Sequence, residues 1–408
     1  MTEWFSIIGY VLLIYSCSVG FKLFAGEGNI SDLIETGQGD LVKQLAFIAC
    51  LSLAMLAIFT SKVKARIIYL QPYFLFACVI FLYFGLTLTW SEVPDVAFRR
   101  LVNTVIVFMC GYTFVSILGI EKSLNILQLV LLILIGLSYL SIPIVPEAKH
   151  TYSALDFELV GSWKGLFPHK NVSGMLASIL VGLLVIDYFR AKKTYLLILV
   201  FLCTLFLLMT KSKSSIYLLI PTLIYAFYMS SNFDRRVVSF VASLSFVFLI
   251  FFVFLLFLFV LNKVISSDAF TGRGGIWEVV SAIIADNYLL GVGFSSIFHV
   301  GLNSPLYDYT SGWEVLAASA HNGYFDIAAQ TGLIGFLLTV IFLYLIVRML
   351  TMDWGLRNLV LKMSFLFVFM LLHNITESSL FDTAKSGWLI MVLVYSMVVQ
   401  LGREKNNG

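Results

Sequence analysis

The stretch VVSFVASLSFVFLIFFVFLLFLFVLN, residues 237–262, decides the fold of this chain. It contains no charged residue, and it is longer than the roughly 20 apolar residues that a helix needs to cross a lipid bilayer. In lipid, a backbone group without a hydrogen-bond partner is too costly, so a segment like this one has to be helical. We therefore expect a membrane-spanning helix here.

The composition of the whole chain extends this expectation. Of the 408 residues, 60% are hydrophobic and 12% are charged, whereas soluble domains carry about 25% charged residues. We predict an all-α polytopic membrane protein that forms a single integral membrane domain over residues 1–408. About twelve spans are expected, near residues 4–23, 42–60, 67–89, 101–118, 124–143, 171–189, 194–210, 214–230, 237–262, 321–347, 358–373 and 383–401.

The short loops between these spans predict the orientation. Basic residues gather in alternate loops, such as FRAKK at 189–193 and RMLTMDWGLR at 348–357. The loop at 25–40 belongs to the opposite set and holds four acidic residues and no basic one. Since Lys and Arg concentrate in cytoplasmic loops, we expect both termini to be cytoplasmic. We interpret the first span as retained, because no basic region precedes it and no signal-peptide cleavage site follows it.

Several kinds of site have no signal in the sequence. All five cysteines lie inside apolar runs, which argues against a disulfide framework and against a thiolate metal site. No Cys/His cluster has zinc spacing, and no phosphate loop of the Walker type is present. We therefore expect no metal, no cofactor and no nucleic-acid partner.

Cationic residues lie on the outer side, close to the ends of spans. They are Arg99, Arg100, Lys164, Lys170, Lys211, Lys213 and Arg273. Any one of them could be a side chain that extends along the span to reach lipid headgroups. Together they favour a shared anionic ligand, because like charges gathered at a membrane edge require one.

The long outer loop at 263–320 is the first of the segments that hold candidate residues. We expect a helix that begins at Thr271 or Gly272 and lies on the membrane surface. Its apolar face would carry Trp277, Val280 and Ile283. In its first turn Arg273 could bind phosphate together with free backbone N–H groups. The alternative is an ion pair with Asp268 or Glu278. Further along, Gly291 and Gly293 predict a tight turn that approaches a ligand or another helix.

Three polar segments supply the other candidates. His321 and Asn322 stand where the tenth span begins, and a histidine that titrates near neutral pH suits general-base catalysis. The alternative for His321 is a hydrogen bond to a loop carbonyl. The last outer turn, HNITESSLFD at 373–382, supplies Glu377. The stretch GSWKGLFPHKNVSGM at 161–175 supplies Lys164, His169, Lys170 and Asn171.

These residues suit a lipid-linked pyrophosphate as substrate. Displacement of a pyrophosphate requires that its charge is stabilised and that the acceptor hydroxyl is activated. Arginines and lysines can provide the first function, and a histidine can provide the second. Such a donor carries its own leaving group, so no further energy source is needed.

The order of five short motifs resembles that in the O-antigen ligase / Wzy polymerase superfamily of bacterial envelope proteins. The motifs are GLFPHKNVSG, the KSKSS turn, TGRGGIW, GVGF and AHNGYFDIAAQTGLIG, and the resemblance covers roughly residues 85 to 380. It is closest to the ExoQ-like exopolysaccharide polymerase branch. The resemblance implies a GT-C-like glycosyltransferase of the bacterial inner membrane, with one long periplasmic loop.

The resemblance also implies a substrate and roles for residues. The donor would be a glycan on undecaprenyl pyrophosphate, the acceptor a second glycan, and a chain-length regulator a candidate partner. Arg273 and His321 correspond to the essential pair of the family, so they are the expected catalytic residues. The expected substrate-binding residues are Arg99, Arg100, Lys164, His169, Lys170, Asn171, Lys211, Lys213, Asn322 and Glu377. Lys213 stands where ligases carry an arginine, which favours the polymerase branch.

Three functions follow from the sequence. The first is polymerisation of lipid-linked repeat units at the periplasmic face. The second is ligation of the glycan to lipid A core by the same chemistry. The third is transport or flipping of a polysaccharide or lipid, with the basic cluster as a substrate site. Against transport, the spans are expected to lack buried charges and internal repeats.

Overall fold

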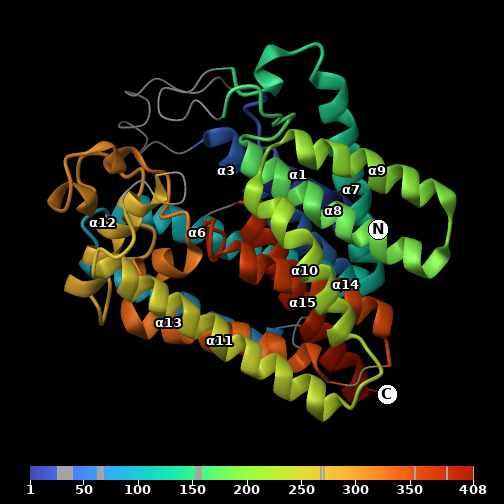
Figure 1. Cartoon of the computed structure of the whole chain (residues 1–408). Coiled ribbons are helices and arrows are strands. Elements are labelled where there is room, and N and C mark those ends of the chain that lie inside the picture. The colour runs from blue at the N-terminus through green and yellow to red at the C-terminus, as the bar shows by residue number, and fades with distance from the viewer. Residues whose placement is uncertain are drawn as a thin grey trace.

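The computed structural model describes residues 1–24, 40–61, 69–151, 159–266, 269, 272–352, 355–382 and 385–407. In these residues the chain forms helices and no strand; the only β-type pairing is an isolated bridge between Lys149 and Trp163. Figure 1 shows long helices that pack along one another, with shorter irregular segments gathered beside α12. The predicted all-α class is confirmed.

Each predicted span corresponds to one helix in the described part of the chain. The helices are α1 (Thr2–Ser18), α3 (Leu41–Thr60), α5 (Pro72–Thr87), α6 (Pro94–Leu118), α7 (Ile120–Ser141), α8 (Lys170–Ala191), α9 (Thr194–Met209), α10 (Lys213–Met229), α11 (Arg235–Leu261), α13 (Gly323–Leu350), α14 (Arg357–His373) and α15 (Ser386–Asn407). An additional helix, α12 (Arg273–Asp286), lies in the long loop. Among the residues that the structure describes, seven helices can cross a membrane by length and composition, and these are α3, α5 with the following turn, α6, α7, α8, α11 and α13. The chain is therefore an integral membrane protein, and the remaining spans stay predictions.

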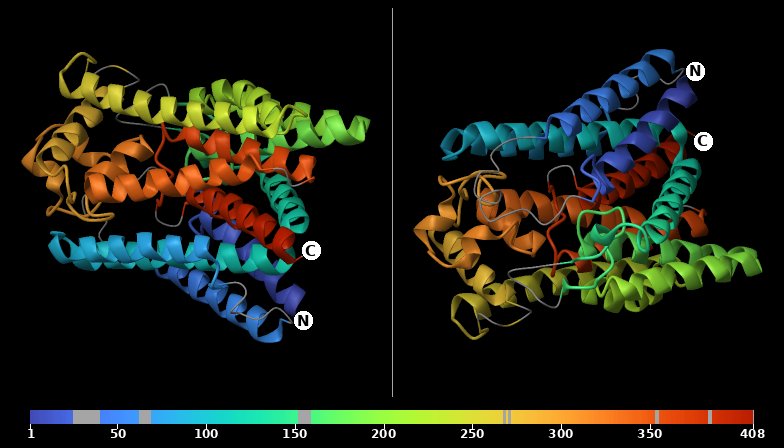
Figure 2. Two further views of the ribbon diagram at one scale, coloured as in Figure 1. Left: turned by 90° about the horizontal axis from the view of Figure 1, so that it is seen from below. Right: turned by 90° about the horizontal axis from the view of Figure 1, so that it is seen from above.

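The two ends of the helix bundle differ in content. In both views of Figure 2 the N- and C-termini lie at one end, and the loop between α12 and α13 lies at the other. This loop contains the short helices η4 (Pro305–Asp308) and η5 (Trp313–Leu316). We call these the terminal end and the loop end of the bundle. The N-terminus and the long loop lie at opposite ends of the bundle, as expected if the chain runs the length of the bundle an odd number of times between them.

Helix α12 begins at Arg273, as the sequence predicts to within two residues, but its environment was predicted wrongly. Trp277, Val280 and Ile283 are almost completely buried. The indole N–H of Trp277 donates to the carbonyl of Ala320 at 2.8 Å. The apolar face therefore packs against protein and not on a membrane surface. The same helical spacing serves a lipid surface or a protein groove, so the sequence could not distinguish them.

The tight turn predicted at Gly291 and Gly293 is confirmed, and it meets a break in α13. Gly332 interrupts that helix with φ +62°, and Gly291 has φ +69°. The N–H of Gly293 donates to the carbonyl of Gln330 at 2.9 Å. A Cβ at Gly332 would lie 2.3 Å from the carbonyl oxygen of Leu289, so only glycine fits this approach of two backbones.

The prediction that the spans lack buried charges is wrong. Lys362 of α14 is buried, and its Nζ lies 2.7 Å from Oδ1 of Asp187 on α8. Nζ also donates to the side-chain oxygen of Gln128 on α7 at 3.0 Å, and the Gln128 amide donates to Asp187 at 2.7 Å. The three side chains form a closed ring that satisfies both charges, which is what a buried ion pair requires.

Candidate functional site

Glu377 is the centre of a polar cluster at the loop end of the bundle. It lies in the turn that follows α14, and its side chain is 13% exposed. The guanidinium of Arg273 lies 2.6 Å from Oε1, and the side-chain amide of Asn171 donates to the same oxygen at 2.7 Å. Arg273 also donates to the carbonyl of Thr376. The cluster thus joins the first residues of α8 and α12 to the turn after α14.

His321 completes the cluster from a fourth segment, the two residues before α13. Its Nδ1 lies 3.3 Å from Oε2 of Glu377, and its side chain is 30% exposed. The residue adopts φ +50°, a left-handed conformation in the turn that leads into α13. Arg273 and His321, which are 48 positions apart in the sequence, therefore contact opposite oxygens of one carboxylate.

The electrostatic balance keeps Glu377 charged. Burial by itself would raise the pKa of Glu377, but the hydrogen bond to His321 and the charges of His321 and Arg273 outweigh it. The pKa of Glu377 is consequently held well below its usual range. A buried carboxylate at neutral pH then faces one permanent cation and one histidine. That arrangement holds the imidazole of His321 in one orientation.

The HKN residues at 169–171 form the N-terminus of α8. His169 is the N-cap, and its Nδ1 accepts a hydrogen bond from the backbone N–H of Asn171 at 3.2 Å. His150 lies against it with ring centroids 4.9 Å apart, and it accepts the backbone N–H of Lys170 at 3.2 Å. Burial, with the nearby His150, lowers the pKa of His169 to about 3. His169 is therefore neutral. Its hydrogen bond with the Asn171 N–H fixes the first turn of α8, from which the Asn171 side chain reaches Glu377.

Arg100 and Asn322, both predicted to bind substrate, are used inside the fold. Arg100 donates to the carbonyls of Ser295, Phe298 and His299 at 2.7–3.0 Å, so it holds the loop after the GVGF turn. Asn322 is completely buried and caps α13, because its side-chain oxygen accepts the backbone N–H groups of Tyr324 and Phe325 at 3.0 and 3.1 Å. These contacts give both side chains a structural role, at a convergent set of carbonyls and at a helix N-terminus. Their predicted part in substrate binding stays a prediction.

The remaining predicted cations lie around the cluster in different ways. The turn that carries Lys211 and Lys213 lies against α8, since a Cβ at Gly174 would be 2.4 Å from the side chain of Ser212. Both of these lysines are exposed, and so is Arg99 at the start of α6. Lys164 is buried, and its carbonyl accepts the hydroxyl of Ser173 at 2.7 Å, which binds the 161–165 segment to α8. Lys170 is half-buried at the first position of α8.

The phosphate site expected at the first turn of α12 stays a prediction, and the structure places an acidic side chain next to it. A Cβ at Gly275 would lie 3.0 Å from a carboxylate oxygen of Glu314, so an acidic side chain already faces this helix end. Glu278, one of the alternative partners of Arg273, pairs with Lys263 at 2.9 Å. The other alternative, Asp268, lies outside the described residues. The actual partner, Glu377, is 104 positions further along the chain.

Two histidines near the cluster were not among the predicted site residues. One is His150, which supports the α8 N-cap. The other is His373, whose Nε2 lies 3.5 Å from the hydroxyl of Ser215 at the start of α10. Their only signal was that a chain with five histidines places them near predicted span ends. In the described ranges, no group of three His, Cys, Asp or Glu side chains could hold a metal ion.

Residues 198–340 match the family model described as O-antigen ligase. The matched segment runs from α9 into α13, so it includes Arg273 and His321, whereas Asn171 and Glu377 lie outside it. No curated protein matches the chain. The family match confirms the resemblance to the O-antigen ligase / Wzy polymerase superfamily and supports a role in glycan assembly as a polymerase or ligase. The ExoQ-like branch stays a prediction.

Proposed function

We propose that this chain polymerises oligosaccharide repeat units carried on undecaprenyl pyrophosphate. The glycan would pass from the lipid pyrophosphate to a hydroxyl of an acceptor glycan, at the periplasmic face of a bacterial inner membrane. The termini would then be cytoplasmic, and a chain-length regulator is a candidate partner. The observation that carries the proposal is the contact of both Arg273 and His321 with Glu377, which joins the start of α12 and the residues before α13 to the turn after α14.

In this proposal His321 acts as the general base. Because Nδ1 faces Glu377, Nε2 is the nitrogen that takes the proton of the acceptor hydroxyl. The hydroxyl oxygen attacks the anomeric carbon of the donor, the bond from that carbon to the pyrophosphate oxygen breaks, and its electron pair leaves with the lipid pyrophosphate. Glu377 holds the imidazole in one orientation and stabilises the imidazolium that forms.

Arg273 would stabilise the leaving pyrophosphate. A guanidinium has five N–H donors, and the contacts with Thr376 and Glu377 leave further donors for a phosphate oxygen. Since these contacts fix the guanidinium before substrate arrives, little reorganisation is needed when charge develops. Lys170, Lys211 and Lys213 lie in segments that border the cluster, and we propose that they add positive charge for the diphosphate.

Two alternatives remain in competition with the polymerase. A ligase would use the same cluster and transfer the glycan to lipid A core, and its loss would leave polymer that never reaches lipopolysaccharide. Loss of a polymerase would instead leave a single capped repeat unit. A transporter is favoured by one observation, the buried Lys362–Asp187 pair. That pair is satisfied by Gln128 within the protein, as a structural ion pair would be.

The decisive experiment is turnover of a purified lipid-linked repeat unit by the wild type and by His321→Ala. We expect a loss of roughly 10²–10⁴-fold, the usual contribution of a positioned general base. The matched control is His299→Ala, a histidine of the same loop whose contact is the carbonyl of Leu316 at 3.4 Å. A His321→Ala protein that polymerises at nearly the wild-type rate would refute the base assignment.

A further inference from the structure

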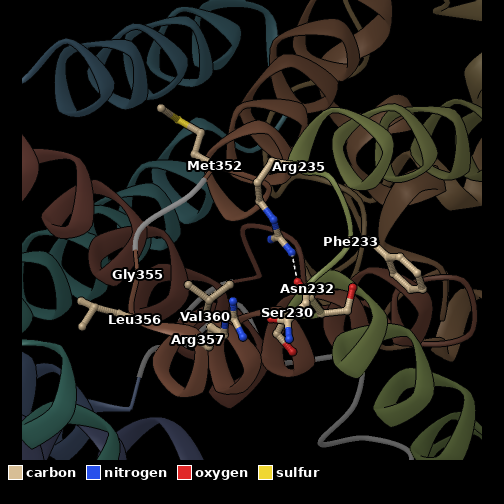
Figure 3. A pocket seen from close by; sticks show the side chains of 10 residues that line it. Ser230, Asn232, Phe233, Arg235, Met352, Gly355, Leu356, Arg357 and Val360 are labelled. Atoms are coloured by element: carbon tan, nitrogen blue, oxygen red, sulfur yellow. Dashed lines mark hydrogen bonds between the residues drawn. The ribbon is translucent and has the colours of Figure 1, made fainter.

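A basic cavity lies at the terminal end of the bundle, remote from the Glu377 cluster. Its volume is about 500 Å³, and its lining includes Arg235 and Arg236 from α11 and Arg348 from α13. A smaller cavity of about 120 Å³ adjoins it, shares Arg235, and adds Arg357 from α14. Figure 3 shows Arg235 directed at the turn with Ser230 and Asn232, while Arg357 approaches the same turn from α14. Three helices thus contribute four arginines to these two cavities, which share Arg235.

Two of these arginines are fixed by the fold. Arg235 donates to the carbonyls of Met229 and Ser231, and Arg348 donates to the hydroxyl of Ser239 at 2.6 Å. Among the residues that the structure describes, no carboxylate forms an ion pair with any of the four arginines. The cluster therefore has positive charge held in place, with donors that no carboxylate of the described residues neutralises by an ion pair.

The rim of the cavity combines charge with exposed apolar surface. Phe240 lines the larger cavity and Phe233 the smaller one, and they are 67% and 62% exposed. In Figure 3, Phe233 projects away from the arginines. A ligand that fits this combination carries a phosphate for the guanidinium groups and an apolar part for the phenyl rings.

The general excess of basic residues in cytoplasmic loops does not explain this convergence. That rule accounts equally for Arg190, Lys192 and Lys193 at the α8–α9 connection. These three residues are exposed, as Arg236, Arg348 and Arg357 also are, and Lys192 lies over the ring of Phe189 at 4.7 Å. The arginines of α11 and α13 differ because they line one cavity together.

We infer that this cavity binds the phosphate group of an anionic phospholipid. The bound phosphate would join the first turn of α11 to the last turn of α13. In Figures 1 and 2 these two helices run side by side from the terminal end to the loop end, where α13 begins just after His321. The inference concerns lipid binding alone and does not depend on the proposed glycosyl transfer.

The test measures lipid binding to the full-length protein in detergent. Phosphatidylglycerol and zwitterionic phosphatidylcholine are added separately, and bound lipid is counted by native mass spectrometry while the unfolding midpoint is recorded. We expect at least about tenfold tighter retention of phosphatidylglycerol by the wild type, and loss of that preference in Arg236→Gln/Arg348→Gln. Arg235→Lys is a second variant, because it keeps the charge but loses the two-carbonyl geometry.

Two controls decide the outcome. Arg190→Gln removes one arginine at the same end but outside the cavity, so it should retain the lipid preference; an equal loss there would mean diffuse attraction and would overturn the inference. Inorganic phosphate is tested alone at matched phosphate concentration. If it protects the protein as well as phosphatidylglycerol does, the ligand is free phosphate and the lipid assignment is wrong. Equal retention of lipid by wild type and double variant would likewise overturn it.

Discussion

The two ends of the helix bundle use their arginines in opposite ways. At the loop end, Arg273 is paired with a buried carboxylate and a carbonyl, and Arg100 is surrounded by three carbonyls. At the terminal end, Arg235, Arg236 and Arg348 line a cavity with no carboxylate partner among the described residues. We propose that Arg273, fixed by its carboxylate, serves the reaction, whereas the arginines without a carboxylate partner among the described residues hold an anion.

The largest effect is expected from neutralising the carboxylate at the loop end. Glu377→Gln keeps the shape but removes the charge that orients His321 and fixes Arg273. We expect turnover to fall by roughly 10³–10⁴-fold, as when a histidine base loses its orienting carboxylate. Initial rates with purified protein and donor lipid measure this. Asp382→Asn, in the same turn but paired with Lys385 at 2.6 Å, is the matched control. Comparable losses in both variants would show that the turn, and not the carboxylate, is what matters.

The next effect tests whether the pairing of Arg273 matters beyond its charge. Arg273→Lys keeps a cation but cannot contact Glu377, Thr376 and a phosphate in the same geometry. We expect turnover to fall by about 10²-fold with little change in donor binding. The kcat and KM values for the donor lipid separate the two effects. A variant with an unchanged kcat would mean that charge alone suffices and would weaken the contrast between the two ends.

Acid should destabilise the loop end through groups that the terminal end lacks. The folded-state pKa of His169 is depressed from 6.5 to about 3, so the unfolded chain binds the extra proton first. Stability from this group is complete above pH 6.5 and is lost as pH falls toward 3. Glu377 has a depressed pKa too, so its contribution is lost below its unfolded value of 4.5.

The measurement is the unfolding midpoint between pH 7.5 and 5 for the wild type and His169→Asn. Asparagine can still cap α8 but does not titrate in this range. We expect the wild-type midpoint to fall with acid and the variant to show a flatter curve. Parallel curves would mean that His169 does not account for the acid sensitivity.

The smallest effect separates two asparagines that the sequence treated alike. Asn171→Ala removes one donor to Glu377, so we expect a several-fold loss of turnover with little change in stability. Asn322→Ala removes the cap of α13 and should cost about 1 kcal/mol of stability. Rates and unfolding midpoints are measured for both variants. The reverse pattern would exchange their assigned roles.

Much of the fold could be predicted because lipid imposes simple rules. Apolar runs such as 237–262 became helices at the expected places, and even the short break at 210–212 between α9 and α10 was found. What could not be predicted was which partner each helix face contacts. The apolar side of α12 packs against protein instead of lipid, and Lys362, Asp187 and Gln128 contact one another across three helices.

The site shows the same division. Arg273, His321, Asn171 and Glu377 were all candidates from the sequence, yet nothing in their spacing indicated that one carboxylate joins them. Arg100 and Asn322 carried the right chemistry for substrate but are used by loop carbonyls and a helix cap. Residue type predicts what a side chain can do; long-range packing decides which of those options is used.

The buried ring of Lys362, Asp187 and Gln128 has a mechanical consequence. Asp187 lies 16 positions after Asn171 on α8, a distance of about 24 Å along the helix. Lys362 lies near the start of the antiparallel α14, and Glu377 lies in the turn that follows this helix. The ring therefore joins α8 and α14 at one end, and the Asn171–Glu377 hydrogen bond joins them at the other. These contacts oppose separation of α8 and α14 at both ends. We therefore expect Lys362→Met to weaken the contact between Asn171 and Glu377, although Lys362 lies far from the Glu377 cluster.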